Sequence, residues 1–117
     1  MEIYNKWYQV LGDTERARAE TLLIYSGITP EVAKIEKLAP SFIDTALFAD
    51  NVKFINTLEA SYFRPQNATE SEIKRCTDNL LSKTKFKSMS QRIYEIKNIQ
   101  DKYSYLIGVS DTIEALK

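Results

Sequence analysis

Apolar residues recur every three or four positions along most of this 117-residue chain, which is the spacing of one face of an α-helix. The clearest example follows Thr69–Glu72, whose sequence TESE matches a helix-capping box. The apolar stripe behind it consists of Ile73, Cys76, Thr77, Leu80 and Leu81. We predict an amphipathic helix here, with this stripe facing the core.

The remaining periodic segments are separated by residues that end helices. Gly12, Gly27 and Gly108 each follow an apolar stripe, and Pro40 prevents the segment before it from continuing as a helix. The pattern predicts helices over residues 2–11, 14–26, 30–39, 41–63, 70–81, 88–107 and 111–117, the fourth being either one bent helix or two that meet at Asp50. The last long helix begins at Ser88 or Ser90 in this interpretation, and Gly108 ends it.

No segment of useful length alternates apolar and polar residues as a strand does. The best strand candidate is Leu22–Ser26, but its surroundings are helical, so we assign it to the second helix. We therefore predict an all-α fold: a compact single-domain helical bundle of about five to seven helices that spans residues 1–117. A chain of this length buries roughly two-thirds of its unfolded surface, which is enough to fold without metals or disulfides.

Composition narrows the environment and the partners. Sixteen basic and sixteen acidic residues cancel, so no net charge draws the protein to nucleic acid or to an anionic membrane. Cys76 is the only cysteine, which excludes an intramolecular disulfide. The start of the chain lacks the basic-then-apolar order of a secretion signal, and no apolar run approaches the ~20 residues of a membrane span. We expect a cytoplasmic protein, and the abundance of Ile, Lys, Asn and Tyr favours an AT-rich genome such as that of a low-GC bacterium or its phage.

The chain contains no histidine, which removes the commonest general acid–base group and the commonest metal ligand. Catalytic Ser-His-Asp and Cys-His systems are thereby excluded. The three glycines are isolated, so no glycine-rich phosphate-binding loop exists. No segment has the ligand spacing of a calcium or magnesium loop. We predict no catalytic residues, no metal, no cofactor and no enzymatic activity.

The one polarised stretch is KTKFKSMSQR, where Lys83, Lys85, Lys87 and Arg92 occur without an intervening acid. Residues two apart lie about 200° apart around a helix, but on the same side of an extended strand. The three lysines therefore form one basic edge only if residues 83–87 are extended, with Phe86 turned to the core. Such a connector would lead into the amino-terminus of the last long helix.

Free backbone N–H groups at a helix start, hydroxyl groups and nearby cations together make an anion site. The candidate residues for binding an anion or an acidic partner are Lys83, Lys85, Lys87, Ser88, Ser90 and Arg92. Three interpretations remain open: a solvated loop, which faces the acidic residues 39–63; a dock for an acidic protein; or a grip for phosphate or nucleic acid. In residues 39–63 three acids stand against one lysine.

Residues 20–38 resemble a helix-turn-helix in outline, with a glycine turn and a threonine cap. The apolar residue after the turn, Val32, falls one position early. The second helix also offers Glu31, Lys34, Glu36 and Lys37, which include no side chain suited to reading bases and two acids that would face phosphates. An ordinary helical hairpin is the simpler interpretation.

Aromatic residues supply a second kind of candidate surface. Tyr4 and Tyr8 lie one turn apart, beside the apolar face of the first helix, and Tyr105 neighbours the apolar stripe that contains Tyr103. We single out these three tyrosines, Tyr4, Tyr8 and Tyr105, as candidates for contact with a partner, since tyrosine is enriched at interface hot spots. The spacing of Ile96, Ile99, Tyr103 and Leu106 resembles a short coiled-coil seam, so a homodimer through residues 89–107 is an alternative to packing within the domain.

The leading hypothesis from sequence is a non-catalytic helical protein–protein interaction module, which regulates, adapts or inhibits a partner protein. It rests on the missing catalytic groups, the neutral charge and the spare aromatic residues. The alternative is a nucleic-acid-binding regulator that uses the basic stretch from Lys83 to Arg92. The identity of the partner does not follow from the sequence.

Overall fold

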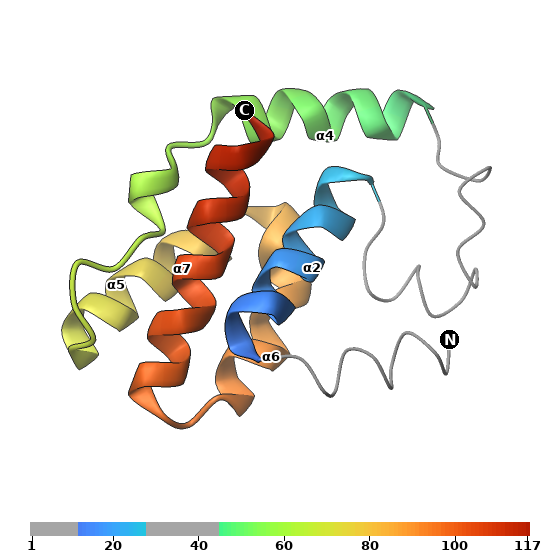
Figure 1. Ribbon diagram of the computed structural model, residues 1–117. Helices are drawn as coiled ribbons and strands as arrows, with labels where there is room; N and C mark the ends of the chain where they lie inside the picture. Colours follow the sequence, from blue (N-terminus) through green and yellow to red (C-terminus); the bar gives the residue numbers. More distant parts are fainter. Residues whose placement is uncertain (1–11, 28–44) are drawn as a thin grey trace, which may run out of the picture.

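The computed structural model describes residues 12–27 and 45–117, and these residues form an all-α structure (Figure 1). Its α-helices are α2 (Asp13–Tyr25), α4 (Thr45–Thr57), α5 (Glu70–Leu81), α6 (Ser90–Glu95) and α7 (Ile99–Leu116). Two 3₁₀-helices, η2 (Ala60–Tyr62) and η3 (Thr84–Met89), connect them. Within the described residues there is no strand, so the predicted all-α class is confirmed.

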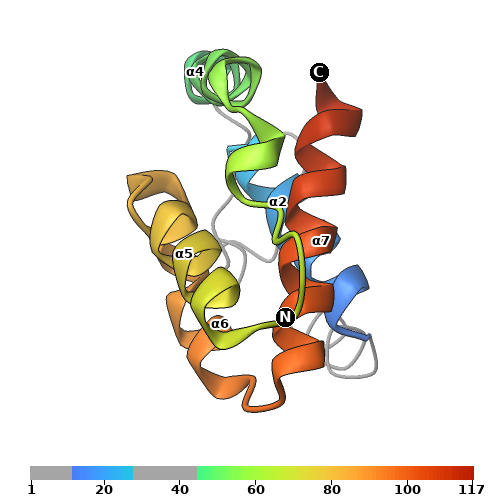
Figure 2. The ribbon, with the colours of Figure 1, turned by 90° about the vertical axis from the view of Figure 1, so that its left-hand side faces the viewer.

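Helix α7 is the centre of the arrangement. Helix α2 lies alongside it in both ribbon views, α5 lies on the side of α7 away from α2 in Figure 1, and α4 crosses near the carboxyl end of α7 (Figures 1 and 2). Helix α6 lies close to α2, since the Arg92 guanidinium of α6 is 3.9 Å from the Glu20 carboxylate of α2. The largest fully buried side chains come from several of these elements and from the turn after η2: Ile55, Phe63, Leu80, Phe86, Met89, Ile93, Tyr105, Leu106 and Ile113. They belong to one continuous core. Isolated helices of this length are only marginally stable in water, so packing against this core supplies most of their stability.

The start of α5 follows the predicted position but not the predicted bonding. Thr69 is the N-cap residue, yet its side chain makes no capping hydrogen bond. Instead the Asn67 side-chain oxygen accepts from both the backbone N–H and the hydroxyl of Thr69, and Glu72 accepts from the backbone N–H of Gln66. The predicted hydrogen bonds of a capping box are therefore wrong, although the helix starts where the box predicts. The stripe behind it is confirmed, because Ile73, Cys76, Thr77 and Leu80 are buried.

The prediction of one long helix over residues 88–107 is wrong. The chain leaves the helix at Ile96, which is extended (φ −76°, ψ 111°), and a new helix starts after Asn98. Asn98 causes this restart, since its side-chain oxygen accepts from the backbone N–H groups of Gln100 (2.8 Å) and Asp101 (3.2 Å). The result is a short α6 and a long α7 that leave in different directions (Figure 2).

Gly108 does not end a helix, contrary to the prediction, but lies in the middle of α7. A Cβ atom at this position would lie 2.5 Å from the backbone oxygen of Thr14 and 2.9 Å from the Cβ of Ala17, both in α2. The glycine therefore allows α2 and α7 to approach closely. Thr14 adds a hydrogen bond across the same contact, from its hydroxyl to the Ser104 carbonyl (3.2 Å).

Two other predicted boundaries can be checked. Gly27 follows α2 with a positive φ of 78°, so its predicted role as the stop after this helix is confirmed. Asp50 and Asn51 lie inside α4, so no new helix begins at this pair. The strand candidate Leu22–Ser26 is helical through Tyr25. Tyr4, Tyr8 and the helix predicted over residues 30–39 lie outside the described residues.

None of the helices in the part of the chain that the structure describes is both long and apolar enough to cross a bilayer.

Candidate functional site

The basic stretch is not extended, because Thr84–Met89 forms the 3₁₀-helix η3. The three lysines therefore do not share one edge. The Lys85 ammonium donates to the Asn51 side-chain oxygen (2.7 Å) and lies 5.3 Å from the centre of the Phe54 ring, so this lysine is held against α4. Lys83 and Lys87 remain exposed. Phe86 is buried, as expected.

Two of the other residues of the predicted anion site, Ser90 and Arg92, are also committed to local contacts. The Ser90 backbone N–H bonds to the Lys87 carbonyl, so η3 runs directly into α6 without a free helix start. The Ser88 hydroxyl is buried and has no hydrogen-bond partner among the described residues. The Arg92 guanidinium lies 3.2 Å from the Glu95 carboxylate and 3.9 Å from that of Glu20. The structure thus does not gather the predicted residues into one anion-binding cradle.

Tyr105 is completely buried, so its prediction as a surface contact is wrong. Its hydroxyl donates to the carboxylate of Glu20, which is buried in α2. The pair joins α2 to α7 and explains why a tyrosine rather than a phenylalanine stands in the core: the buried carboxylate needs a donor. This contact joins residues 85 positions apart, so nothing local in the sequence indicates it.

The seam proposed for a homodimer lies inside the domain. Met89, Ile96 and Leu106 are buried, and Ile99 and Tyr103 pack against the same core. The helix that would carry the seam is also divided between α6 and α7. These apolar residues therefore pack within the domain and do not form a surface on which a second copy could dimerise.

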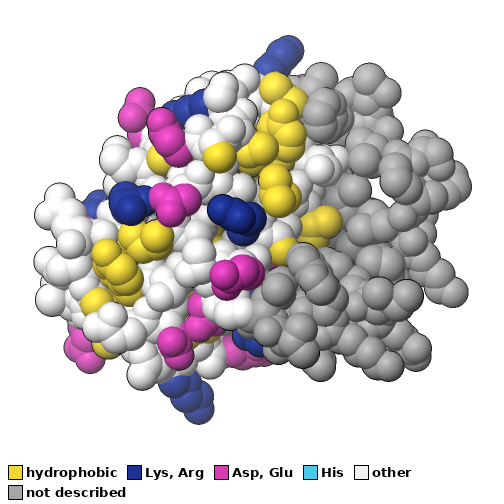
Figure 3. Space-filling view, in the orientation of Figure 1, with side chains coloured by type: hydrophobic (Ala, Val, Ile, Leu, Met, Phe, Trp, Pro, Cys, Tyr) yellow, Lys and Arg dark blue, Asp and Glu magenta, His cyan; other side chains and the backbone are white. Residues whose placement is uncertain are grey.

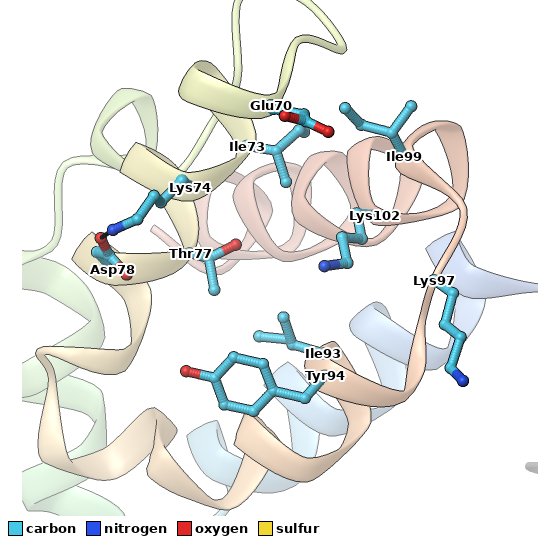
Figure 4. Close-up of a pocket in the computed structure, with 10 residues that line it drawn as sticks. All are labelled: Glu70, Ile73, Lys74, Thr77, Asp78, Ile93, Tyr94, Lys97, Ile99 and Lys102. Carbon is cyan, nitrogen blue, oxygen red and sulfur yellow. Dashed lines mark hydrogen bonds and ion pairs between the residues drawn. The ribbon is translucent and has the colours of Figure 1, made fainter.

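A groove between α5, α6 and α7 is the candidate functional site (Figure 4). Its volume is about 420 Å³, within the range of ligand sites in proteins. Ten residues line it: Glu70, Ile73, Lys74, Thr77 and Asp78 from α5, Ile93 and Tyr94 from α6, Lys97 from the connector, and Ile99 and Lys102 from α7. Three of them are buried and five are exposed, so the groove has a closed floor and an open mouth.

The floor of the groove is apolar and its mouth is polar. Ile73 and Ile93 are almost fully buried, and Ile99 packs partly against the core. Tyr94 follows Ile93 directly but is 66% exposed, and in Figure 4 its ring stands across the groove from Thr77. This arrangement of a buried aliphatic surface beside an exposed aromatic ring is typical of a binding site.

The charged residues of the groove differ in whether they are already paired. Lys74 and Asp78 form an ion pair one helical turn apart (3.0 Å). The side chains of Glu70, Lys97 and Lys102 form no ion pair or hydrogen bond with any of the residues that the structure describes. Lys97 is exposed, whereas Lys102 is half-buried, and its ammonium points into the groove toward Thr77 and Ile93 (Figure 4).

Sequence reasoning missed Tyr94, Lys97 and Lys102 as site residues. Tyr94 and Lys97 flank the predicted stripe of a helix that in fact breaks between them. Only the turn at Ile96 to Asn98 brings α7 back against α5 and α6, so the groove depends on a boundary that the periodicity did not reveal. The one local signal in the sequence is that Tyr94 directly follows Ile93. In a helix, neighbouring residues face different directions, so with Ile93 in the core Tyr94 would be expected to lie off the apolar stripe.

A second, smaller hollow of about 350 Å³ lies on the α2 side of α6 and contains both signs of charge. Its charged residues are Asp13, Arg16, Arg92, Glu95, Lys97 and Asp101. Burial, and then the neighbouring Asp101 carboxylate, raise the pKa of Asp13 above its usual value. Mixed charges of this kind are typical of an ion-pair network between helices, and the space-filling view likewise shows acids and bases interspersed on one face (Figure 3).

Cys76 is buried in the middle of α5, as predicted. Burial raises the pKa of its thiol; the Arg75 guanidinium opposes this effect and the Glu72 carboxylate adds to it. The reactive thiolate is therefore scarce at neutral pH, and the sulfur is inaccessible.

We expect a thiol reagent such as dithiobis-nitrobenzoate to modify Cys76 of the native protein at pH 8 on the order of a hundredfold more slowly than in denaturant, since access requires opening that costs about 3 kcal/mol or more. The colour released with time measures the rate. Equal rates in native and denatured protein would contradict a buried thiol.

Among the described residues, no group of three or more acidic or cysteine side chains is placed to hold a metal ion. No family model, no curated protein and no solved structure matches this chain, so the candidate site stands on its own geometry.

Proposed function

We propose that this protein is a non-catalytic interaction module and that a partner protein binds in the groove between α5, α6 and α7. The observation that carries the proposal is Tyr94, two-thirds exposed at the mouth of a groove whose floor is made of buried isoleucines. Regulation, adaptation or inhibition of the partner are the roles that such a module performs. The absence of histidine from the chain supports a role in binding rather than in catalysis.

An exposed aromatic ring on a rigid helix is well suited to carry binding energy. Hot spots of interfaces are enriched in tyrosine and sit beside well-packed pockets from which a partner excludes water. Tyr94 is a tyrosine beside a well-packed pocket, because its neighbour Ile93 belongs to the core. Lys74 and Lys97 flank the groove and provide a polar rim around it. Burying such a ring together with an apolar floor contributes a favourable term of roughly 25 cal/mol per Å².

The nucleic-acid alternative has less support. Lys83 and Lys87 are exposed, but Lys85 is held by Asn51, so the stretch offers no continuous row of cations for a phosphate backbone. The neutral charge of the whole chain points the same way. Binding to DNA or RNA that weakens steeply with salt, and that is lost when Lys83 and Lys87 become glutamate, would restore this alternative.

Tyr94→Ala is expected to weaken binding of the partner to the full chain at least tenfold, since hot-spot truncations cost about 2 kcal/mol or more. The variant should therefore no longer capture the partner. The full chain, immobilised by a terminal tag, captures proteins from an extract of the organism that encodes it, and mass spectrometry identifies the species that the wild type retains and Tyr94→Ala does not.

Tyr62→Ala is the matched control. Tyr62 is likewise exposed (56%) but lies at η2, outside the groove. Helix content by circular dichroism should be unchanged in both variants, since neither side chain belongs to the core. A partner lost equally with both substitutions, or retained with both, would refute the assignment of the groove as the binding surface.

A further inference from the structure

The charge inside the groove indicates what kind of partner segment it accepts. Lys102, a half-buried residue of α7, points its ammonium into the groove and has no ion-pair partner among the described residues (Figure 4). A cation that is partly removed from water and lacks a partner gains when a carboxylate approaches it, and the gain is larger there than on an open surface. The Thr77 hydroxyl, which faces the same space, is an additional hydrogen-bond donor for that carboxylate.

The other charges give the groove a direction. Lys97 lies at the rim with its ammonium directed out of the groove, and Lys74 is neutralised by Asp78, so Lys102 is the cation that faces the interior (Figure 4). Glu70 stands at the opposite end, above Ile73 and beside Ile99 in Figure 4. An acidic group is therefore favoured beside Lys102 and disfavoured near Glu70.

The apolar floor sets the second requirement. Ile73 and Ile93 lie on either side of the space into which Lys102 points, and Ile99 lies farther along the groove, so a group that places a carboxylate on Lys102 also brings neighbouring atoms against isoleucine side chains (Figure 4). A polar neighbour would lose its hydration there, whereas an apolar one gains by leaving water. The groove thus fits an acid with an apolar group next to it.

Accepting the proposed function, we infer that the occupant is a partner segment in which an Asp or Glu lies beside a large apolar residue, the carboxylate binding Lys102 and the apolar side chain covering the isoleucine floor. The open mouth favours a polypeptide over a free small acid. Small ligands are usually enclosed over most of their surface, whereas half of the residues that line this groove are exposed.

Selection from a random 12-residue peptide library displayed on phage tests the inference directly. The full-length wild type is the bait, and binders that Tyr94→Ala still retains are discarded. We expect the remaining sequences to be enriched in Asp or Glu adjacent to Leu, Ile, Phe or Met. Synthetic versions should bind Lys102→Gln roughly tenfold more weakly than wild type, while Lys53→Gln, in α4, should leave affinity unchanged.

The outcomes separate the two proposals. Groove-dependent peptides that carry no acid, or whose affinity is the same for Lys102→Gln, would overturn the acidic class of partner and leave the groove as a binding surface. A selection that yields no peptide sensitive to Tyr94→Ala would overturn the proposed function itself. Circular dichroism of each variant confirms that the fold is intact before affinities are compared.

A second arm tests the source of the carboxylate. Hexanoate and phenylacetate carry a carboxylate and an apolar group without a peptide backbone. They should displace a selected peptide only at concentrations at least a hundredfold above the peptide's own dissociation constant, since they cover less of the groove. Displacement at equal concentrations would assign the groove to a free small acid and reject the peptide as its occupant.

Discussion

Replacing Phe86 by alanine is expected to lower the free energy of unfolding by about 3–5 kcal/mol, a large fraction of the stability of a domain of this size. Phe86 is fully buried, although it comes from a 3₁₀-helix between two charged residues. Its ring packs on Phe54 (5.6 Å between centroids) and edge-to-face on Phe63 (6.0 Å). It thereby joins η3 to α4 and to the turn after η2.

Urea titration followed by circular dichroism at 222 nm measures the loss. The midpoint should fall while the slope stays constant, because the surface exposed on unfolding changes little. Phe86→Leu, which leaves a smaller void, should fall between wild type and Phe86→Ala. Lys87→Ala, at the adjacent exposed position, should change stability by less than about 0.5 kcal/mol. A Phe86→Ala protein as stable as wild type would show that η3 is not part of the core.

Phe86 also explains the outcome for the basic stretch. The sequence places a phenylalanine between Lys85 and Lys87, and burial of that ring was the element of the hypothesis that the structure confirms. The ring can reach the core from an extended segment or from a 3₁₀-helix, and the two place the lysines differently. The sequence alone does not distinguish them, because the difference lies in how η3 packs on α4.

The features that the sequence predicted correctly are those decided within one helix. The α5 stripe needs only the 3.6-residue period, and the stop at Gly27 needs only a residue that tolerates a positive φ. The buried state of Cys76 follows from its place on that stripe. Each of these is local, so neighbouring residues carry the whole signal.

The features that it missed depend on contacts between distant segments. The buried Tyr105 donates a hydrogen bond from its hydroxyl to the carboxylate of Glu20, which lies in another helix. The break at Asn98 competes with an apolar period that continues through it, and the cap prevails once α7 can pack on α2. The groove could not be predicted for the same reasons. It is formed by segments distant in sequence, and it exists only because the chain breaks after α6 and α7 returns beside α5 and α6.

Gly108 offers the sharpest test of how α2 and α7 fit together, because two physical effects predict opposite signs. Within a helix, alanine is more favourable than glycine by about 1 kcal/mol, so on helix propensity alone Gly108→Ala would stabilise the protein. We expect destabilisation by about 1–2 kcal/mol instead, and by about 3 kcal/mol for Gly108→Val, since overpacking a tight contact costs about 1–3 kcal/mol and more for a branched side chain.

The close approach of the two helices makes the packing cost larger than the gain in helix propensity. The new Cβ would lie 2.5 Å from the Thr14 carbonyl oxygen and 3.1 Å from the Thr14 Cα, both backbone atoms that cannot rotate away. The helices must separate, which weakens the Thr14–Ser104 hydrogen bond and opens the core around Ala17. Thermal and urea unfolding measure the effect, with Glu114→Ala at an exposed position of α7 as the control for helix propensity. A Gly108→Ala protein more stable than wild type would mean that α2 and α7 can move apart at no cost, and the glycine would then have no packing role.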